Sequence, residues 1–317
     1  MNKVVDVLKE RAIYVALVVL FLVFACLSDD FLSPNNLRNI VRQISVLGIA
    51  SVGMTYVILI GGIDLSTGSV ITFVNIITAY FMVNLGMNMW LAILLAVLAS
   101  TGIGFLNGFL VANFNMPSLI VTFASQTIFE GLAYLISNGM PIFGFPKAFA
   151  VIGQGYLGFI PLPVIVMAAI FLIGGFLLNR TYFGRYFYAL GGNETAARMA
   201  GIRVKRIKYL IFSLSGLFAG IAGIIMLART NSGQPTAGKG YEFEVITGVV
   251  LGGVSLSGGS GKLSNVVAGV LIMGILKNGM VLLNVSEYIQ MVVEGIILLL
   301  AVGFDCIQKG KLGYQNH

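Results

Sequence analysis

The stretch Met89-Trp-Leu-Ala-Ile-Leu-Leu-Ala-Val-Leu-Ala-Ser-Thr-Gly-Ile-Gly-Phe-Leu-Asn-Gly-Phe-Leu-Val-Ala112 contains no charged side chain. It is as long as the roughly 17–25 residues that a helix needs to cross the hydrocarbon of a bilayer. Because hydrocarbon offers no water to backbone amides, only helices and closed barrels can cross it. The stretch does not alternate strictly between polar and apolar residues, as a barrel strand would. It therefore predicts a membrane-spanning helix.

The rest of the chain has the same character. Of its 317 residues, 58% are hydrophobic and 10% are charged, whereas roughly 25% are charged in a soluble domain. The mean hydropathy is +0.96. We predict an all-α fold, a polytopic helical membrane bundle that forms a single domain over residues 1–317 with about ten transmembrane helices. The third and eighth are the weakest, since they are rich in glycine, serine and threonine. The predicted spans lie near residues 12–28, 43–61, 68–86, 89–112, 118–137, 161–178, 209–228, 244–258, 264–284 and 287–304.

Basic residues set the expected orientation. If the N-terminus is cytoplasmic, 13 of the 19 lysines and arginines fall on the cytoplasmic side. The positive-inside rule then predicts that both termini are cytoplasmic. This topology accounts for the net charge of +7, so the charge gives no reason to expect nucleic-acid binding. The 13 residues are Lys3, Lys9, Arg11, Arg180, Arg185, Arg198, Arg203, Lys205, Arg206, Lys208, Lys262, Lys309 and Lys311.

Residues for catalysis or nucleotide binding are scarce. The one histidine is His317, the last residue, so histidine-based acid–base or metal chemistry is not expected. Residues 258–263 (Gly-Gly-Ser-Gly-Lys-Leu) are superficially similar to a phosphate-binding loop. However, Leu256 replaces its first glycine and Leu263 replaces the serine or threonine that would hold magnesium. We expect no cofactor or metal on this chain, and any ATP that drives it to be bound by another subunit.

A few carboxylates lie in or beside the predicted spans, where their burial cost makes them candidates for function. Asp64 either belongs to a transport pathway or caps the helix that follows it. Glu130, half-way through a span, either faces the pathway or makes a helix–helix contact. Glu294 is expected to pair with Lys277 of the preceding span.

One short sequence occurs twice. Residues 61–69 (Gly-Gly-Ile-Asp-Leu-Ser-Thr-Gly-Ser) recur at 252–260 as Gly-Gly-Val-Ser-Leu-Ser-Gly-Gly-Ser, each copy between two apolar spans. Interrupted helices at matching places in two halves of a membrane protein indicate a transport pathway. Alternatively, the glycines only permit close helix packing. Our span count predicts that the two copies have the same orientation.

A basic, polar segment at residues 179–209 separates the sixth and seventh spans. Within it, Asn193 is a good N-cap, Glu194 suits a first helical turn and Gly201 supplies a left-handed stop. We predict a two-turn helix with a small alanine face. Because so short a helix is unstable alone, it must pack on the bundle or in a groove of a partner.

The segment from Ala189 to Arg198 (Ala-Leu-Gly-Gly-Asn-Glu-Thr-Ala-Ala-Arg), followed by Gly201-Ile202, resembles the cytoplasmic signature of permease subunits in ribose-type ABC importers. The resemblance runs from about Leu32 to Ala301. One departure is Glu130-Gly131, which stands where an Arg-Gly pair is common in the family; another is Thr67, where valine is frequent. Further matching stretches are Val52–Thr55 with Gly62–Ser66, Gln234–Gly238 with Gly240–Glu242, and Val250–Gly253 with Tyr288–Met291.

The resemblance implies a permease in the bacterial cytoplasmic (inner) membrane, surrounded by membrane lipid. It would pair with a second copy or a sister permease and work with a cytosolic ABC ATPase and an extracytoplasmic sugar-binding protein. The loops at 141–162 and 234–244 would receive the binding protein. The helix that docks on the ATPase would be formed by Gly192, Asn193, Glu194, Ala196, Ala197 and Gly201.

A pathway for a neutral sugar should offer small side chains and hydrogen-bonding groups. The candidates, including the two carboxylates, are Asp64, Ser66, Ser69, Asn75, Asn107, Ser125, Gln126 and Glu130. Two other functional classes stay open. A secondary carrier driven by an ion gradient would use Asp64 and Glu130, and a membrane scaffold would transport nothing.

Overall fold

A computed structural model describes residues 2–313, with side chains for residues 12–307. His317 and the basic residues outside 12–307 that entered the charge count lie outside the described side chains. The described chain forms thirteen helices and one two-stranded hairpin. In order they are α1 (Asn2–Leu27), α2 (Pro34–Leu59), α3 (Thr67–Val83), α4 (Met89–Asn113), α5 (Ser118–Ser137), α6 (Lys147–Gln154), β1 (Tyr156–Leu157), β2 (Ile160–Pro161), α7 (Leu162–Arg180), α8 (Tyr182–Gly192), α9 (Glu194–Met199), α10 (Val204–Thr230), α11 (Tyr241–Leu251), α12 (Leu263–Leu282) and α13 (Glu287–Gly313).

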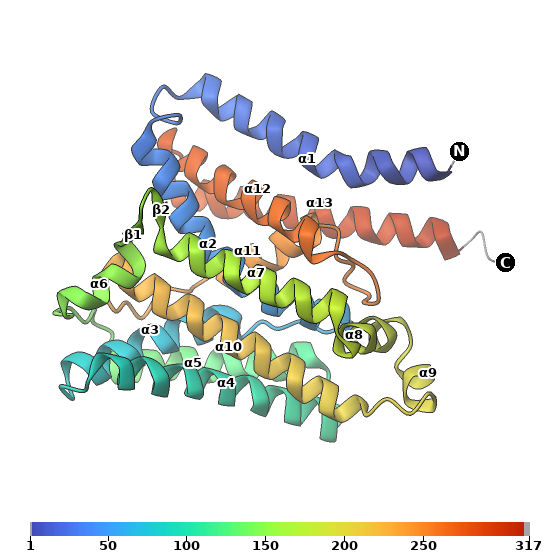
Figure 1. Cartoon of the computed structure of the whole chain (residues 1–317), viewed down its shortest axis with the longest axis horizontal. Coiled ribbons are helices and arrows are strands. Elements are labelled where there is room, and N and C mark those ends of the chain that lie inside the picture. Colours follow the sequence, from blue (N-terminus) through green and yellow to red (C-terminus); the bar gives the residue numbers. More distant parts are fainter. Residues whose placement is uncertain (1, 314–317) are drawn as a thin grey trace.

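The long helices lie along one another and form a bundle (Figure 1). The start of α1, the end of α13 and the short helices α8 and α9 lie at one end of the bundle. Helix α6 and the antiparallel hairpin, with Tyr156 opposite Pro161, lie at the other end. The predicted helical bundle is therefore confirmed.

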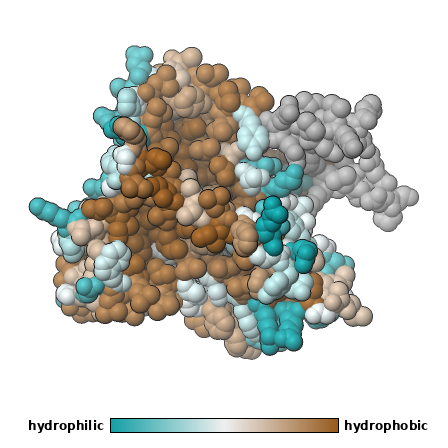
Figure 2. All heavy atoms as spheres, viewed as in Figure 1, coloured by the Kyte–Doolittle hydropathy of each residue, from teal (hydrophilic) through white to brown (hydrophobic). Residues whose placement is uncertain are grey.

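Seven helices of the described chain are long and apolar enough to cross a membrane. The apolar part of α1, residues 12–27, and helix α3 are shorter, and α11 has 11 residues. Apolar side chains cover most of the face seen in Figure 2, and polar ones gather toward its two ends. An apolar band between polar ends is the surface expected of a protein that crosses a bilayer. The count of ten spans stays a prediction.

Local sequence signals set the helix boundaries. Helix α2 starts after Ser33, whose hydroxyl accepts a hydrogen bond from the Asn36 amide (3.3 Å), and it has Pro34 at its first position. The Asn88 side chain caps α4 by accepting from the Trp90 amide (2.9 Å). Helix α10 ends at Asn231 in the left-handed conformation (φ 51°). Asparagine tolerates that conformation better than most residues do.

Helix α10 is the centre of the bundle and packs on α2, α3 and α4. Its contact with α4 is close because small residues face each other. A Cβ atom at Gly104 of α4 would come within 3.0 Å of the Phe212 carbonyl, and one at Gly216 of α10 within 3.0 Å of the Ser100 carbonyl. Small residues spaced by four let membrane helices approach in this way. In this helix pair, the glycines therefore permit close packing.

Two sequence-based expectations are corrected, one about the partner of Lys277 and one about the segment at 179–209. Lys277 of α12 forms its ion pair with Glu244 of α11, not with Glu294. The Lys277 ammonium also lies 5.5 Å from the centre of the Tyr241 ring, within the range of a cation–π contact. The segment at 179–209 contains α8 in addition to the predicted short helix, since α8 turns Phe187 and Leu190 into the core.

Replacing Gly104 with valine should separate α4 from α10. Overpacking of a close contact costs about 1–3 kcal/mol, so we expect a lower thermal midpoint of the detergent-purified protein, followed by size-exclusion fluorescence. Gly102→Val is the control on the same helix, because a Cβ atom at Gly102 meets nothing within 4 Å. Equal midpoints for the two variants would contradict the close packing of α4 and α10.

Candidate functional site

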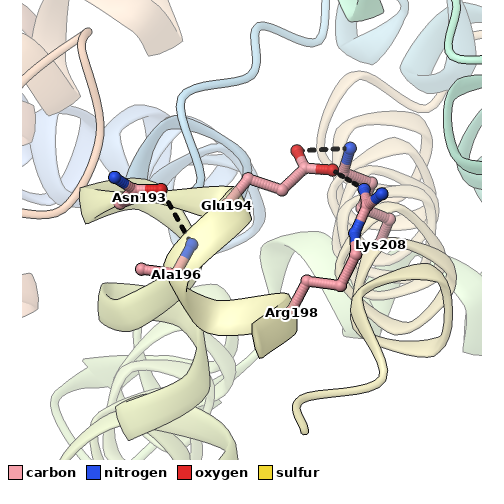
Figure 3. Close-up of polar contacts among 5 residues, drawn as sticks. All are labelled: Asn193, Glu194, Ala196, Arg198 and Lys208. Atoms are coloured by element: carbon pink, nitrogen blue, oxygen red, sulfur yellow. Dashed lines mark hydrogen bonds and ion pairs between the residues drawn. The ribbon is translucent and has the colours of Figure 1, made fainter. Parts of the chain in front are cut away.

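Helix α9 is built by the signals that its sequence carries. The Asn193 side-chain oxygen accepts a hydrogen bond from the Ala196 amide at 2.9 Å (Figure 3). At the other end, Gly201 adopts a positive φ of 82°, and the Ile202 amide donates to the Ala197 carbonyl at 3.1 Å. This is the closing pattern of a helix that ends at a left-handed glycine. The predicted N-cap and stop are confirmed.

Glu194 attaches α9 to the bundle. Its carboxylate accepts from Arg198 at 3.0 Å and from Lys208 of α10 at 2.8 Å (Figure 3). Partial burial raises the pKa of Glu194, but the hydrogen bonds and positive charges of Lys208 and Arg198 outweigh it, so the pKa lies below its usual value. Glu194 is therefore charged at neutral pH. Since this carboxylate is partly exposed, each pair contributes little stability and mainly fixes geometry.

We predicted a small alanine face on α9, but the alanines of this helix lie on two faces that differ in exposure. Ala197 is only 4% exposed and is turned toward the chain's own helices, with α8 and α10 as the neighbours of α9. Ala196 is exposed, and Met199 is 86% exposed. Of the other residues expected to dock, Gly192, Asn193 and Gly201 are exposed and Glu194 is half-buried. Helical spacing puts Ala196 and Met199 on one face and could have identified Met199.

The two copies of the repeated sequence lie in loops that touch each other. We name residues 60–66, between α2 and α3, the first glycine loop, and residues 252–262, between α11 and α12, the second glycine loop. The Gly259 amide donates to the Leu59 carbonyl at 2.8 Å, where α2 ends. A Cβ atom at Gly258 would lie 2.7 Å from the Gly61 amide nitrogen. Only glycine permits this approach, and Gly258 also has a positive φ of 80°.

Helix α8 closes the same junction from a third side. A Cβ atom at Gly191 would come within 3.0 Å of both the Leu59 carbonyl and the Gly259 amide nitrogen. The Tyr188 hydroxyl donates to the Gly261 carbonyl at 2.8 Å. Gly191 lies two residues before the cap of α9. We name this three-way contact of Gly191 with the two glycine loops the glycine junction.

An aspartate carboxylate accepts hydrogen bonds from each glycine loop. In the first, Asp64 is 2% exposed and accepts from the Ser66 amide (3.0 Å), the Ser66 hydroxyl and the Ser215 hydroxyl of α10 (2.7 Å). In the second, Asp305 of α13 accepts from the Ser255 hydroxyl at 2.9 Å. Ser255 occupies the place in the repeat that Asp64 has in the first copy. The bonds of Asp64 favour the interpretation that it orders the start of α3.

Two further pathway candidates belong to the same polar cluster. The Asn107 amide of α4 donates to the Ser66 hydroxyl at 3.1 Å, and the Ser125 hydroxyl of α5 donates to the Asn107 side-chain oxygen. Asp64, Ser66, Asn107 and Ser125 are all buried. These four side chains are bonded within one buried cluster that also includes Ser215, which the sequence analysis missed. They join the first glycine loop to α4, α5 and α10.

Ser69 and Asn75 are also buried in α3. The Ser69 hydroxyl donates to the Ser66 carbonyl at 2.9 Å, and the Asn75 side-chain oxygen accepts from the Gln234 amide at 2.9 Å. Asn75 thereby ties α3 to the loop between α10 and α11.

Gln126 and Glu130 of α5 are the two pathway candidates with partly exposed side chains. The Gln126 amide donates to Glu242 of α11 at 2.9 Å. Glu242, which is buried, was not among the predicted site residues. Whether any of the eight candidates lines a pathway stays a prediction.

Comparison with known proteins gives consistent matches. Residues 36–302 match a family model described as "Branched-chain amino acid transport system / permease component". The chain is 42% identical to ribose import permease protein RbsC of Bacillus subtilis (strain 168), over 94% of this chain and 93% of that protein. It is 43% identical to RbsC of Escherichia coli (strain K12), over 94% of each.

Another relative is the L-arabinose transport system permease protein AraH of Escherichia coli (strain K12), with 43% identity over 95% of this chain and 92% of that protein. No solved structure matches. The family match includes α9 and both glycine loops.

Replacing Asn193 with alanine should loosen α9. Loss of an N-cap costs about 1 kcal/mol, so amide exchange of residues 196–202 should rise about fivefold, measured by mass spectrometry. Thr195→Ala is the control, because the Thr195 side chain is exposed and has no hydrogen bond among the described residues. Unchanged exchange in Asn193→Ala would show that the cap does not hold α9.

Proposed function

The chain belongs to the family of the branched-chain amino acid transport system permease component, and we propose that it is the membrane-spanning permease subunit of an ABC importer for a monosaccharide, ribose or a related sugar. The observation that carries this proposal is 42–43% identity, over nearly the whole chain, to permeases named for ribose and L-arabinose. Both sugars are neutral pentoses. The nearly equal identity to both groups supports that chemical class and does not single out one sugar.

ATP is bound and hydrolysed by a separate subunit. The glycine-rich stretch 258–263 is engaged in internal contacts, with the Gly259 amide bonded to Leu59 and the Gly258 amide bonded to Ser255 at 2.9 Å. A phosphate-binding loop needs such amides free to cradle phosphates. The structure of this loop therefore agrees with its lack of a magnesium-binding serine or threonine at Leu263.

The ATPase docks on the exposed face of α9. This face presents Ala196 and the largely exposed Met199 beside the ordered cap of Asn193. An exposed methionine on a short, preformed helix suits insertion into an apolar cleft, since methionine adapts to irregular surfaces. In this role Ala197 packs on the bundle at the inner face of α9 and does not touch the ATPase.

Movement of α9 reaches the membrane helices through the glycine junction. Because Gly191 packs directly on the backbone of Leu59 and Gly259, a shift of α8 and α9 must displace the ends of α2 and α11 or break these contacts. The first glycine loop in turn holds α4, α5 and α10 through Asp64, Ser66 and Asn107. ATP binding thus changes the relative stability of two arrangements of the bundle, as any ligand-driven switch requires.

The pathway runs along α5, against a second permease copy or a sister permease. Gln126 and Glu130 are partly exposed within the span, and polar groups in hydrocarbon are costly unless protein or water covers them. A second permease would cover them and leave an aqueous route for the sugar. The buried candidates Asp64, Ser66, Ser69, Asn75, Asn107 and Ser125 then support the pathway from behind.

The end of the bundle with α6 and the hairpin faces the outside and receives the sugar-binding protein, so both termini are cytoplasmic in the bacterial inner membrane. The two loops proposed for this contact are joined, since Ile142 and Gly233 exchange backbone hydrogen bonds of 2.8 Å. Within residues 234–244, Glu242 and Glu244 are buried and take no part.

Replacing Met199 with glutamate should prevent docking. A charge on an apolar contact surface costs several-fold to a hundredfold in affinity, so co-purification of the ATPase and ATP-dependent ribose uptake into liposomes should both fall at least tenfold. Met140→Glu, at the opposite end and also exposed, should leave ATPase co-purification unchanged. Uptake by the permease alone under a proton or sodium gradient would instead identify a secondary carrier.

Replacing Gly191 with alanine should separate docking from transport. The added Cβ atom overlaps the Leu59 carbonyl while the docking face of α9 stays intact. We expect ATPase binding within about twofold of the wild type but sugar uptake reduced about tenfold or more, given typical coupling free energies. Gly175→Ala of α7, whose Cβ atom would have no neighbour closer than 4.0 Å, is the control. Normal uptake by Gly191→Ala would remove the glycine junction from the mechanism.

A further inference from the structure

A basic groove lies beside α9, at the end of the bundle that carries α8 and α9. It has a volume of about 420 Å³ and is formed where the end of α4 meets α9 and the start of α10. Its lining residues are Ala112, Asn115, Glu194, Arg198, Arg203, Val204, Lys205, Arg206 and Lys208. Five of these nine side chains are basic and one is acidic.

The positive charge of the groove is largely uncompensated. Glu194 pairs with Arg198 and Lys208. Lys205 donates to the neutral Asn113 side chain at 3.2 Å. The side chains of Arg203 and Arg206 form no ion pair or hydrogen bond with any residue that the structure describes, and both residues are exposed. Two adjacent free guanidinium groups are well suited to bind the oxygens of a phosphate.

Aromatic side chains place the groove at the membrane surface. On the bundle side of the groove, the Asn113 amide donates to the Tyr209 hydroxyl at 2.6 Å, and the Tyr209 ring stacks on Phe109 with centroids 6.1 Å apart. Tyrosine with an apolar ring and a bonded hydroxyl is typical of the level of lipid headgroups. The basic groove is therefore at the depth of the phosphates of one leaflet.

An apolar surface continues from the groove along α4. Phe105, Leu106 and Phe109 on this helix are exposed, and Phe114 at its end is 64% exposed. Tyr209 covers part of Phe105 and Phe109, and the remaining surface of these side chains is open. A ligand that fits both parts has an anionic head and long apolar chains.

We propose that this groove binds an anionic phospholipid of the cytoplasmic leaflet. Its headgroup phosphate would contact Arg203 and Arg206, and its acyl chains would lie on Phe105, Leu106 and Phe109 of α4. Basic pockets between membrane helices at the cytoplasmic side are suited to such headgroups. The continuous apolar surface favours a lipid over an acidic surface of the ATPase or free phosphate, which would use only the cationic part. The orientation rests on the proposed function, but lipid binding can be measured without transport.

Because Lys208 and Arg198 line the groove and also hold Glu194, a bound phosphate would lie next to the ion pairs that attach α9 to α10. The lipid would therefore add a negative charge beside the docking helix.

The test is a titration of the full-length permease in detergent with phosphatidylglycerol or phosphatidylcholine of the same chain length, with bound lipid counted by native mass spectrometry. The variant Arg203→Gln/Arg206→Gln is compared with Arg180→Gln/Arg185→Gln. The second pair removes the same charge from the same polar segment, 179–209, but outside the groove. A basic residue near an anionic surface contributes roughly a fivefold factor, so the groove variant should bind phosphatidylglycerol about 30-fold more weakly. The control pair should stay within about twofold, and millimolar inorganic phosphate should not displace the lipid.

Four results would overturn the proposal. Equal losses in the two variant pairs would reduce it to a general effect of charge. Equal binding of phosphatidylcholine and phosphatidylglycerol by the wild type would show that the groove does not recognise an anionic headgroup. Displacement by inorganic phosphate would indicate a site for a free anion, and loss of ATPase binding with normal lipid binding would assign the groove to the ATPase. None of these results depends on sugar uptake, so they leave the transport assignment to its own test.

Discussion

Two helices, α2 and α11, end where their backbones are packed against other parts of the chain, and the structure depends on how the polar groups freed there find partners. The groups freed at the two breaks bond to each other and to buried side chains. The Leu59 carbonyl at the end of α2 accepts from the Gly259 amide, and the carboxylates of Asp64 and Asp305 accept from residues of the two loops. A backbone hydrogen bond therefore joins the two breaks directly, and an aspartate bonds to each loop.

This arrangement connects a structural requirement to transport. Loops that bond to each other by backbone contacts cannot move independently, and Gly191 places α8 against the same contacts. The absence of side chains at Gly191, Gly258 and Gly259 makes the junction dense and stiff, as packed protein interiors are. A force applied to α9 by an ATPase is then applied at the point where two membrane helices are interrupted. Bistable packing at such a point can convert a small displacement into a change of the whole bundle.

The sequence was most informative where the signal is local. The cap at Asn193 and the stop at Gly201 follow from residue chemistry within one or two turns, and the structure confirms them. Family resemblance extended this to the importer class, which composition alone could not reach. The identity of the repeated loops was visible, but their mutual contact was not, since residues 59 and 259 are far apart in the chain.

The features that the sequence did not predict depend on tertiary packing. The inward face of a six-residue helix is decided by its neighbours, so the burial of Ala197 could not be predicted from the sequence. The partner of Lys277 is Glu244 because α11 and α12 lie side by side, and sequence distance gave no reason to prefer it over Glu294. Hydrogen-bonding residues such as Asn107 and Ser66 suit a sugar pathway and a buried cluster equally well. The structure shows that they are bonded in a cluster, and their place in a pathway stays a prediction.

Coupling through the glycine junction requires that α8 and the second glycine loop move as one unit. Double electron–electron resonance on the assembled importer tests it, with spin labels at Arg185 of α8, Ser257 of the second glycine loop and Phe159 of the outer hairpin, all exposed positions. We expect ATP binding to leave the Arg185–Ser257 distance unchanged while both distances to Phe159 change together. A change of the Arg185–Phe159 distance with a constant Ser257–Phe159 distance would contradict it.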